Sequence, residues 1–357
     1  MQKLQINATT HIYPIYIQAG IRHSLSDYIA KDYDKILVIT DENVATLYLA
    51  DIRCSLHHEQ VYTITLPPGE HVKQLQTFYD IHTKALQFGL TRQSLIIALG
   101  GGVIGDLAGF VAATYMRGID YIQMPTTILA HDSSVGGKVA INHEYGKNLI
   151  GQFYSPQAVI YDMETLQTLP LKEVRSGYAE LLKEALIAEP TLYNSILSIK
   201  INNIVVEQLK MHVRNGIMIK ANLVEKDEKE ANERKYLNFG HTLGHALETT
   251  LGYGTLAHGE AVAIGILFAM FVSEKKLSAQ LPTKDMYRWL LDNDYPIHLQ
   301  ELSSTSLVKQ MKLDKKVVSN HVQMVLLQAI GEPILQKMDE AELEGLLEQF
   351  FKKINNV

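Results

Sequence analysis

The chain has 357 residues, of which 46% are hydrophobic and 20% are charged, and its formal net charge is -6. A chain of this length and composition is typical of a globular protein with two domains. Its negative charge argues against nonspecific binding to nucleic acid or to an anionic membrane, because both need a basic surface. The single Cys54 excludes an intramolecular disulfide and a cysteine-rich zinc site.

The sequence gives no sign of a membrane segment. Residues 1–16 mix polar and apolar side chains and lack the continuous apolar core of a signal peptide. The longest apolar run, residues 261–272, is too short to span a bilayer and is closed by charged residues at 274–276. We interpret this run as a buried core helix and expect a cytoplasmic protein.

The first half of the chain alternates between strand-like and helix-like patterns. Residues 35–40 and 94–99 are short apolar runs typical of buried parallel strands. Residues 72–88 between them carry apolar side chains near helical spacing, which predicts an amphipathic helix. Further strands are predicted at 121–124 and 158–161. Strand, helix and strand in this order indicate an α/β domain of the Rossmann-like nucleotide-binding type, which we place at residues 1–172.

A glycine-rich motif follows the second of these strands. GGGVIGD at 100–106 matches GxGxxG and precedes a small, apolar helical segment at 107–113. Bare glycines allow a pyrophosphate to approach backbone N–H groups at a helix N-terminus. Asp41, at the end of an earlier strand, is a candidate for binding ribose hydroxyls. The motif therefore indicates a variant dinucleotide site, with a plain tight turn as the alternative.

Two further segments combine glycine with lysine. SSVGGK at 133–138 and GKN at 146–148 could bind an anion through backbone N–H groups and lysine charge. Arg117 and the pair Lys315 and Lys316 could belong to the same site. The alternative for each is a solvated surface loop with incidental basic residues.

The second half is predicted to be mainly helical, from 172 to 272 and again from 339 to 351, and we assign residues 173–357 to a helical domain. His241 and His245 share one helix face at i and i+4, and His258 follows. Glycines next to both histidines cost about 1 kcal/mol each in a helix, so we expect them to allow close approach of a ligand. Ordinary polar residues of a buried helix are the alternative interpretation.

Glu180 could complete a metal site with His241 and His258, because three protein ligands and an open position are typical of catalytic zinc. A surface ion pair with Lys183, three residues later, is the alternative. A polar series leads up to the histidines at residues 220, 230, 234 and 238. It is explained equally well by an exposed helix face and by a substrate cleft.

Taken together and in this order, the motifs resemble those of the 3-dehydroquinate synthase family over nearly the whole chain. The segments that carry the resemblance are PPGE at 67–70 with Lys73, GGGVIGD at 100–106, MRG at 116–118, PTT at 125–127, DSSVGGK at 132–138, GKN at 146–148, AELLK at 179–183, LNFGHTLGH at 237–245 and HGEAVA at 258–263. The segment just before Asp132 is one residue shorter than is usual in the family.

The resemblance implies two cofactors. One is zinc, with cobalt as the alternative metal, held by Glu180, His241 and His258. It implies NAD bound by Asp41, Asn43, Glu70, Lys73, Gly101, Gly102, Val103, Asp106, Thr126, Thr127, Asp132, Ser133, Lys138, Lys147, Thr168 and Leu169. It also implies a homodimer in which Arg117 reaches the site of the neighbouring subunit.

The implied reaction belongs to the shikimate pathway and converts 3-deoxy-D-arabino-heptulosonate 7-phosphate to 3-dehydroquinate and phosphate. It would proceed by transient oxidation with NAD, phosphate elimination, re-reduction and intramolecular aldol closure. By the same resemblance, the phosphate would be bound by Lys138, Asn148, Arg117 and either Lys315 or Lys316. The carboxylate and hydroxyls would face Lys220, Arg234 and Asn238. Proton transfer would involve His245, and hydroxyls and water would be oriented by Asp132 and Lys183.

Three other functions are compatible with parts of the pattern. A sister cyclase acting on sedoheptulose 7-phosphate or glucose 6-phosphate is disfavoured by Asn238 and His245. A metal-dependent polyol or alcohol dehydrogenase would release NADH and would leave the phosphate-binding lysines without a role. A noncatalytic nucleotide-binding regulator would need neither the metal ligands nor the lysines.

Overall fold

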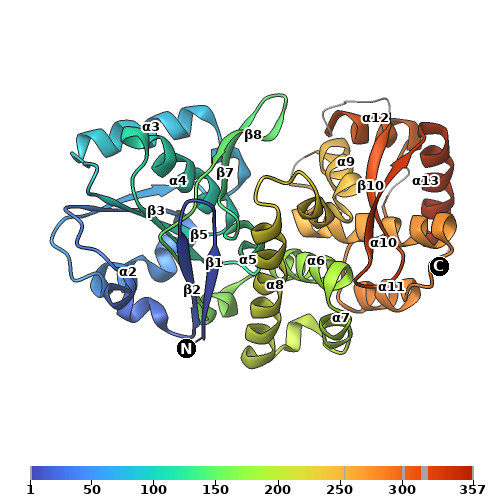
Figure 1. Ribbon diagram of the computed structural model, residues 1–357, viewed down its shortest axis with the longest axis horizontal. Helices are drawn as coiled ribbons and strands as arrows, with labels where there is room; N and C mark the ends of the chain where they lie inside the picture. Colours follow the sequence, from blue (N-terminus) through green and yellow to red (C-terminus); the bar gives the residue numbers. More distant parts are fainter. Residues whose placement is uncertain (1, 253, 300–301, 315–320, 356–357) are drawn as a thin grey trace. The chain divides into compact units, whose positions relative to one another are not determined.

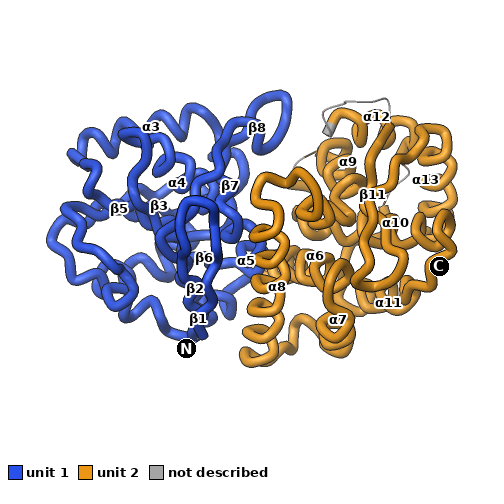
Figure 2. Tube along the Cα trace, viewed as in Figure 1, with its two compact units in different colours: residues 1–169 blue, residues 170–357 orange. Residues whose placement is uncertain are grey.

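The computed structural model describes residues 2–252, 254–299, 302–314 and 321–355. The chain forms two compact units, residues 1–169 and residues 170–357 (Figures 1 and 2). We call them unit 1 and unit 2 and describe each by itself.

Unit 1 is built on a seven-stranded sheet with the order β1-β2-β9-β6-β5-β3-β4. All neighbours are parallel except the first pair. The strands are β1 (Gln2–Asn7), β2 (Ile12–Gln18), β3 (Ile36–Asp41), β4 (Val61–Leu66), β5 (Leu95–Gly100), β6 (Tyr121–Pro125) and β9 (Ala158–Asp162). The structure thus confirms the four strands predicted from apolar runs.

Helices cover both faces of this sheet. As a result, the central strands β5, β6 and β9 are buried along their whole length. One apolar cluster joins the sheet to α3 (Leu75–Gln87) and α4 (Gly102–Thr114). A second cluster joins it to η1 (Ile21–Tyr28) and α2 (Ala50–Ser55). The predicted helices at 72–88 and 107–113 correspond to α3 and α4.

Three hairpins were not predicted from the sequence. One is β1–β2, and another is β7 (Lys138–His143) with β8 (Gly146–Phe153), which forms where we expected polar anion-binding loops. The third is β10 (Val322–Leu327) with β11 (Pro333–Met338) in the otherwise helical unit 2. A two-stranded hairpin needs neighbouring structure to bury its apolar face. Accordingly, β10 lies against α10, and its Leu327 amide donates to Ser273 Oγ on α10 at 3.0 Å.

Unit 2 consists mainly of helices. They are α6 (Leu171–Ala188), α7 (Pro190–Leu197), α8 (Val206–Lys226), α9 (His241–Leu251), α10 (His258–Leu277), α11 (Thr283–Asp292), α12 (Ser304–Asp314) and α13 (Glu340–Asn355). Residues 259–273 of α10 are all buried, which confirms the core helix predicted from the apolar run. Within the described ranges, no helix is long and apolar enough to cross a membrane.

Glycines bring α9 and α10 into close contact. A methyl group on Gly265 would lie 1.9 Å from the carbonyl oxygen of Gly240, and one on Gly244 would lie 3.2 Å from Val262 Cα. Gly240 is the residue before α9 and has a left-handed φ of 82°, so it carries no penalty for a helix interior. The sequence interpretation of these glycines was therefore wrong in one respect. They allow close approach of two helices to each other, and this packing fixes where the histidines lie.

Candidate functional site

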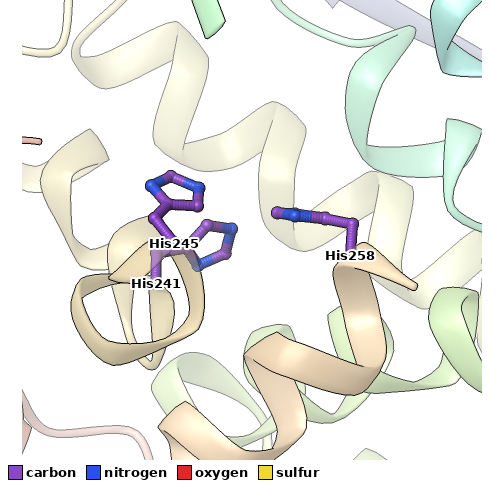
Figure 3. A group of neighbouring side chains, drawn as sticks. All are labelled: His241, His245 and His258. Atoms are coloured by element: carbon purple, nitrogen blue, oxygen red, sulfur yellow. The ribbon is translucent and has the colours of Figure 1, made fainter. Parts of the chain in front are cut away.

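Four side chains from three helices converge in unit 2. Glu180 comes from α6, His241 and His245 come from α9, and His258 is the first residue of α10. Figure 3 shows the three imidazole rings turned toward one another from the two helices. Packing of α10 against both α6 and α9 brings together residues that are 78 positions apart in the sequence, from 180 to 258.

The distances from Glu180 to two histidine nitrogens match those between neighbouring ligand atoms of a tetrahedral metal ion. Glu180 Oε1 lies 3.5 Å from His241 Nε2 and 3.4 Å from His258 Nε2. Metal bonds of about 2.0–2.1 Å in tetrahedral geometry place neighbouring ligand atoms about 3.3–3.4 Å apart. A cation can therefore occupy the space between these three atoms with little rearrangement, and the donor set of two imidazoles and one carboxylate suits zinc or cobalt.

Lys183 determines which carboxylate oxygen faces the histidines. Its Nζ lies 2.5 Å from Glu180 Oε2, one helical turn along α6, and both side chains are almost completely buried. Because Oε2 is bound to the ammonium group, Oε1 is the oxygen directed at the imidazoles. The alternative of a surface ion pair is wrong, since these two side chains are 1% and 2% exposed.

The two histidines differ in protonation. Burial lowers the pKa of His241 to about 3, and the Lys183 charge acts in the same direction. Burial also acts to lower the pKa of His258, but hydrogen bonds to the carboxylates of Glu180 and Glu248 more than offset it and raise the value to about 10. At neutral pH, His241 has a lone pair ready for a cation, whereas His258 must release a proton first.

His245 offers an alternative donor. The candidate ligand atoms of His241, His245 and His258 all lie within 4.8 Å of one another. The ring of His245 stands perpendicular to that of His241, with 5.3 Å between the centroids. The shorter distances to Glu180 favour the carboxylate as third ligand. They leave His245 beside the cluster, where an imidazole can exchange protons.

The polar series before the histidines folds onto the same part of unit 2. Lys220 lies on α8, and Arg234 and Asn238 lie on η7 (Glu233–Asn238); α6 packs against both elements. Lys220 is 5% exposed and Arg234 is 1% exposed, so the alternative of an exposed helix face is wrong for these two residues. Asn238 Nδ2 donates to Glu230 Oε1 at 2.7 Å.

In unit 1, the predicted nucleotide-binding residues gather at one edge of the sheet. The strands β3, β4, β5 and β6 are parallel neighbours, so their carboxyl ends meet at the same edge. Asp41 ends β3, Glu70 and Lys73 follow β4, Gly101 follows β5, and Thr126 follows β6. Ligands of open α/β sheets bind at this kind of edge.

The glycine loop is closely packed. Gly101 is the residue before α4, and a methyl group there would lie 3.0 Å from Thr127 Cγ2. A methyl group on Gly102 would lie 3.1 Å from Ser133 Oγ. Gly102 and Val103 begin α4, where backbone N–H groups have no partner within the helix. This arrangement suits the phosphates of a dinucleotide.

A buried lysine links the glycine-loop helix to the β7–β8 hairpin. Lys73 Nζ lies 2.5 Å from Asp106 Oδ2 on α4 and 2.5 Å from Asn148 Oδ1 on β8. Asn142 on β7 donates from Nδ2 to Glu70 Oε1 at 2.7 Å and accepts from the Asn148 amide at 2.9 Å. The sequence analysis missed Asn142. Nothing in the local sequence distinguishes Asn142. Its contacts with Glu70 and Asn148 depend on the β7–β8 hairpin, which was not predicted.

The remaining predicted residues of unit 1 are placed as follows. Asn43 lies in α1 (Glu42–Val44), which Asp41 caps by accepting from the Val44 amide at 3.0 Å. Asp132 and Ser133 lie in α5 (Ala130–Ser133). Lys138 is exposed at the start of β7, and Lys147 is half-buried on β8. The Thr168 hydroxyl lies 2.5 Å from the Tyr48 hydroxyl, and Leu169 follows it.

Arg117 stands in an uncommon backbone conformation. It is exposed and has a φ of 71°, and Met116 before it has a φ of 47°. Two successive non-glycine residues in the left-handed region are unusual. Lys315 and Lys316 lie outside the described residues.

Two family models match the chain. The model for the N-terminal part of 3-dehydroquinate synthase matches residues 63–176, and the model for its C-terminal part matches residues 177–317. The 3-dehydroquinate synthase of Oceanobacillus iheyensis is 52% identical over 362 residues, which cover 100% of both chains. That of Halalkalibacterium halodurans is 46% identical and covers 97% of this chain and 98% of its own.

Solved structures of sugar-phosphate cyclases share the fold over nearly the whole chain. A 2-deoxy-scyllo-inosose synthase complexed with carbaglucose-6-phosphate, NAD+ and Co2+ is 26% identical, with a TM-score of 0.88 and coverage of 98% of this chain and 100% of its own. A 2-epi-5-epi-valiolone synthase from Streptomyces hygroscopicus with NAD+ and Zn2+ bound is 22% identical, with a TM-score of 0.86 and 99% coverage of both chains. These likenesses confirm the predicted fold class.

Proposed function

The chain belongs to the 3-dehydroquinate synthase family, and we propose that it catalyses the reaction of this family with bound NAD and a divalent metal ion. The reaction converts 3-deoxy-D-arabino-heptulosonate 7-phosphate to 3-dehydroquinate and inorganic phosphate. The activity follows from 44–52% identity to 3-dehydroquinate synthases over 97% or more of the chain. The observation that supports the metal is the separation of 3.5 Å and 3.4 Å between Glu180 Oε1 and the Nε2 atoms of His241 and His258.

Both cofactors fit the residues present. The donor atoms in unit 2 match a cation of the zinc type, and the glycine loop of unit 1 leads into the start of α4, whose free backbone N–H groups suit a phosphate. The solved cyclases described above contain NAD+ with Co2+ or Zn2+. When bound, NAD supplies reversible hydride acceptance at a ring alcohol, and the cation supplies Lewis acidity at substrate oxygens.

In unit 2, we assign the protein groups around the reacting atoms as follows. Glu180, His241 and His258 hold the cation, and Lys183 keeps Glu180 Oε1 directed toward it. His245 lies next to the ligands and moves protons to and from substrate hydroxyls. Lys220 and Arg234 supply buried positive charge suited to the substrate carboxylate.

In unit 1, we assign the substrate phosphate to Lys138, Asn148 and Arg117. Because Asn148 Oδ1 accepts from Lys73, the amide group of Asn148 that can donate to a phosphate oxygen is Nδ2. Lys138 adds a charge-assisted contact from the start of β7. We also propose that the chain forms a homodimer in which Arg117 reaches the site of the neighbouring subunit, and that it is located in the cytoplasm.

The decisive experiment follows phosphate release and NADH absorbance together. The purified chain is supplied with 3-deoxy-D-arabino-heptulosonate 7-phosphate and substoichiometric NAD. We expect one phosphate for each substrate and no net NADH, since the cofactor is regenerated in each turnover. Accumulating NADH would indicate a dehydrogenase. Turnover of sedoheptulose 7-phosphate or glucose 6-phosphate instead would indicate a sister cyclase.

A matched pair of lysine variants tests the phosphate assignment. Lys138→Ala is expected to lower kcat/KM about 100-fold, because a phosphate dianion loses a charge-assisted contact. Lys84→Ala, an exposed lysine on α3 of the same unit, is the control and should change kcat/KM less than twofold. Equal activity of the two variants would remove Lys138 from the site.

Removal of metal tests the ligand assignment. Chelation should abolish turnover of the wild-type chain, and added zinc or cobalt should restore it. His258→Ala should resist this rescue at the same metal concentration, because it lacks one of three protein ligands. Full activity in a preparation shown to be metal-free would contradict the proposal.

A further inference from the structure

The imidazole of His258 is held from its far side by a carboxylate. Glu248 Oε2 lies 3.0 Å from His258 Nδ1, and Glu248 is 5% exposed. An ionised carboxylate only accepts hydrogen bonds, so Nδ1 carries the proton in this pair. Nε2 is therefore the nitrogen that faces Glu180 and can bind a cation.

The backbone just before His258 is held by a second carboxylate. Glu260 Oε2 accepts from the Ala257 amide at 2.9 Å, which caps the first turn of α10. The other oxygen, Oε1, accepts from Arg175 Nε at 3.0 Å and Nη2 at 2.9 Å. The Gly259 amide donates to Ser176 Oγ at 3.0 Å, and a methyl group on Gly259 would lie 2.0 Å from the Ser176 carbonyl oxygen.

These contacts lock the start of α10 against α6, the helix that carries Glu180. The Cα of His258 is thereby fixed, and only rotation of its side chain remains. The contact with Glu248 restricts that rotation. For His241, the hydrogen-bond partner of Nδ1 among the described residues is a backbone carbonyl oxygen, that of Phe239 at 3.3 Å, and not a carboxylate. The anionic partner thus distinguishes His258 from His241.

We propose that Glu248 is a positioning residue that fixes the tautomer and ring orientation of His258 for metal binding and makes its Nε2 a stronger ligand. The inference rests on the metal site put forward under Proposed function. A carboxylate behind a metal-bound histidine commonly contributes a factor of 10–100 in metal affinity. The contribution of Glu248 to turnover passes through His258, since Glu248 contacts the ring nitrogen that faces away from the donor cluster.

The test compares metal affinity in two glutamine variants of the full chain. Glu248→Gln keeps the size of the side chain and removes the charge, and we expect Zn2+ affinity to fall at least about 10-fold in a chelator competition assay. The control is Glu274→Gln on α10, whose carboxylate accepts from Thr283 Oγ1 at 2.5 Å near the opposite end of the helix. This variant should bind Zn2+ within twofold of the wild type.

A spectroscopic measurement separates positioning from general loss of structure. Each variant is loaded with Co2+, and its visible absorption bands are recorded. We expect shifted bands for Glu248→Gln and unchanged bands for Glu274→Gln, because only Glu248 contacts a proposed metal ligand, His258. Circular dichroism should show that both metal-free variants are folded at the temperature of the binding assay, so that reduced affinity reflects the site and not unfolding.

A double-mutant cycle tests whether Glu248 acts through His258. In a His258→Ala background, Glu248→Gln should lower Zn2+ affinity by no more than about twofold, since the group it positions is gone. An equally large loss in both backgrounds would overturn the inference, as would wild-type affinity in Glu248→Gln. Failure of the wild-type chain to bind any metal would instead overturn the metal assignment itself, and the role of Glu248 with it.

Discussion

The two candidate sites of this chain are built from different materials. In unit 1, the glycine loop presents backbone N–H groups at the edge of a parallel sheet. Gly101 and Gly102 have no side chains, and neighbouring side chains leave little space for one. In unit 2, the site consists of side chains from three helices, and two of them, Glu180 and His258, are each held by a second charged side chain. Glycine is important in both units, but for different reasons.

The difference shows where each site is vulnerable. In the loop of unit 1, we expect glycine to let a phosphate approach the backbone, so that an added methyl group would compete with binding. Glycines of α9 and α10 keep space for another helix, so an added methyl group there would disrupt the packing that positions the candidate metal ligands. The same substitution should therefore damage ligand binding in one unit and stability in the other.

The largest effect is expected from removing a metal ligand. His241→Ala should lower kcat/KM at least about 1000-fold, or about 4 kcal/mol, because the cation loses one of three protein ligands. Turnover and bound metal, measured by mass spectrometry, should fall together. His298→Ala, an exposed histidine in unit 2, serves as the control. Turnover above one tenth of wild type with full metal content would show that His241 is not a ligand.

The packing role of glycine in unit 2 is tested by Gly265→Ala. We expect a loss of about 3 kcal/mol in the free energy of unfolding, because the new methyl group would lie 1.9 Å from the Gly240 carbonyl oxygen. Urea unfolding of the metal-free chain measures it. Gly345→Ala on α13 has open space around the new methyl group and should stabilise the chain by about 0.5–1 kcal/mol. Equal effects would refute the proposed packing role.

The corresponding test in unit 1 is Gly101→Ala. The φ of -74° suits alanine, and the new methyl group would contact only a threonine side chain. The free energy of unfolding should change by less than about 1 kcal/mol, whereas NAD should bind about 30-fold more weakly, equal to about 2 kcal/mol. Fluorescence titration with NAD provides the measurement. Unchanged NAD affinity would mean that the loop keeps no space for phosphate.

The smallest expected effect is the pH dependence of metal affinity, which distinguishes His258 from His241. Because the pKa of His258 is about 10 in the metal-free chain, binding of a cation displaces one proton at neutral pH. Metal affinity should rise about tenfold from pH 7 to pH 8, or about 1.4 kcal/mol. His241, whose pKa is about 3, contributes nothing to this dependence. Calorimetry in buffers of different ionisation enthalpy gives the number of protons released per bound cation. A number near zero would contradict a protonated His258 that becomes a metal ligand.

The sign for stability follows from the same pKa. A histidine whose pKa rises on folding, from about 6.5 to about 10, stabilises the metal-free chain fully below pH 6.5. That stabilisation is lost as the pH rises through 10. Replacement by glutamine in His258→Gln should flatten the stability of the metal-free chain over this window.

The fold class, the four central strands and the core helix α10 could be predicted from local patterns. Buried parallel strands are continuous apolar runs, and a helix that is apolar on all sides can only be buried. The two-stranded hairpins could not be predicted in this way. Their strands are stabilised by neighbours that are distant in sequence, as β10 is by α10.

For the site, the sequence by itself determined which residue types were available and which histidines share a helix. It also contained an unused signal, since Glu248 follows His241 and His245 at i+7 and i+3 and so lies on the same helix face. Only the tertiary structure decided that Glu180 faces His241 and His258 with one oxygen, that Lys183 is buried, and that glycines bring the helices together. The physical reason is that spacing along one helix fixes directions, whereas distances between helices depend on packing.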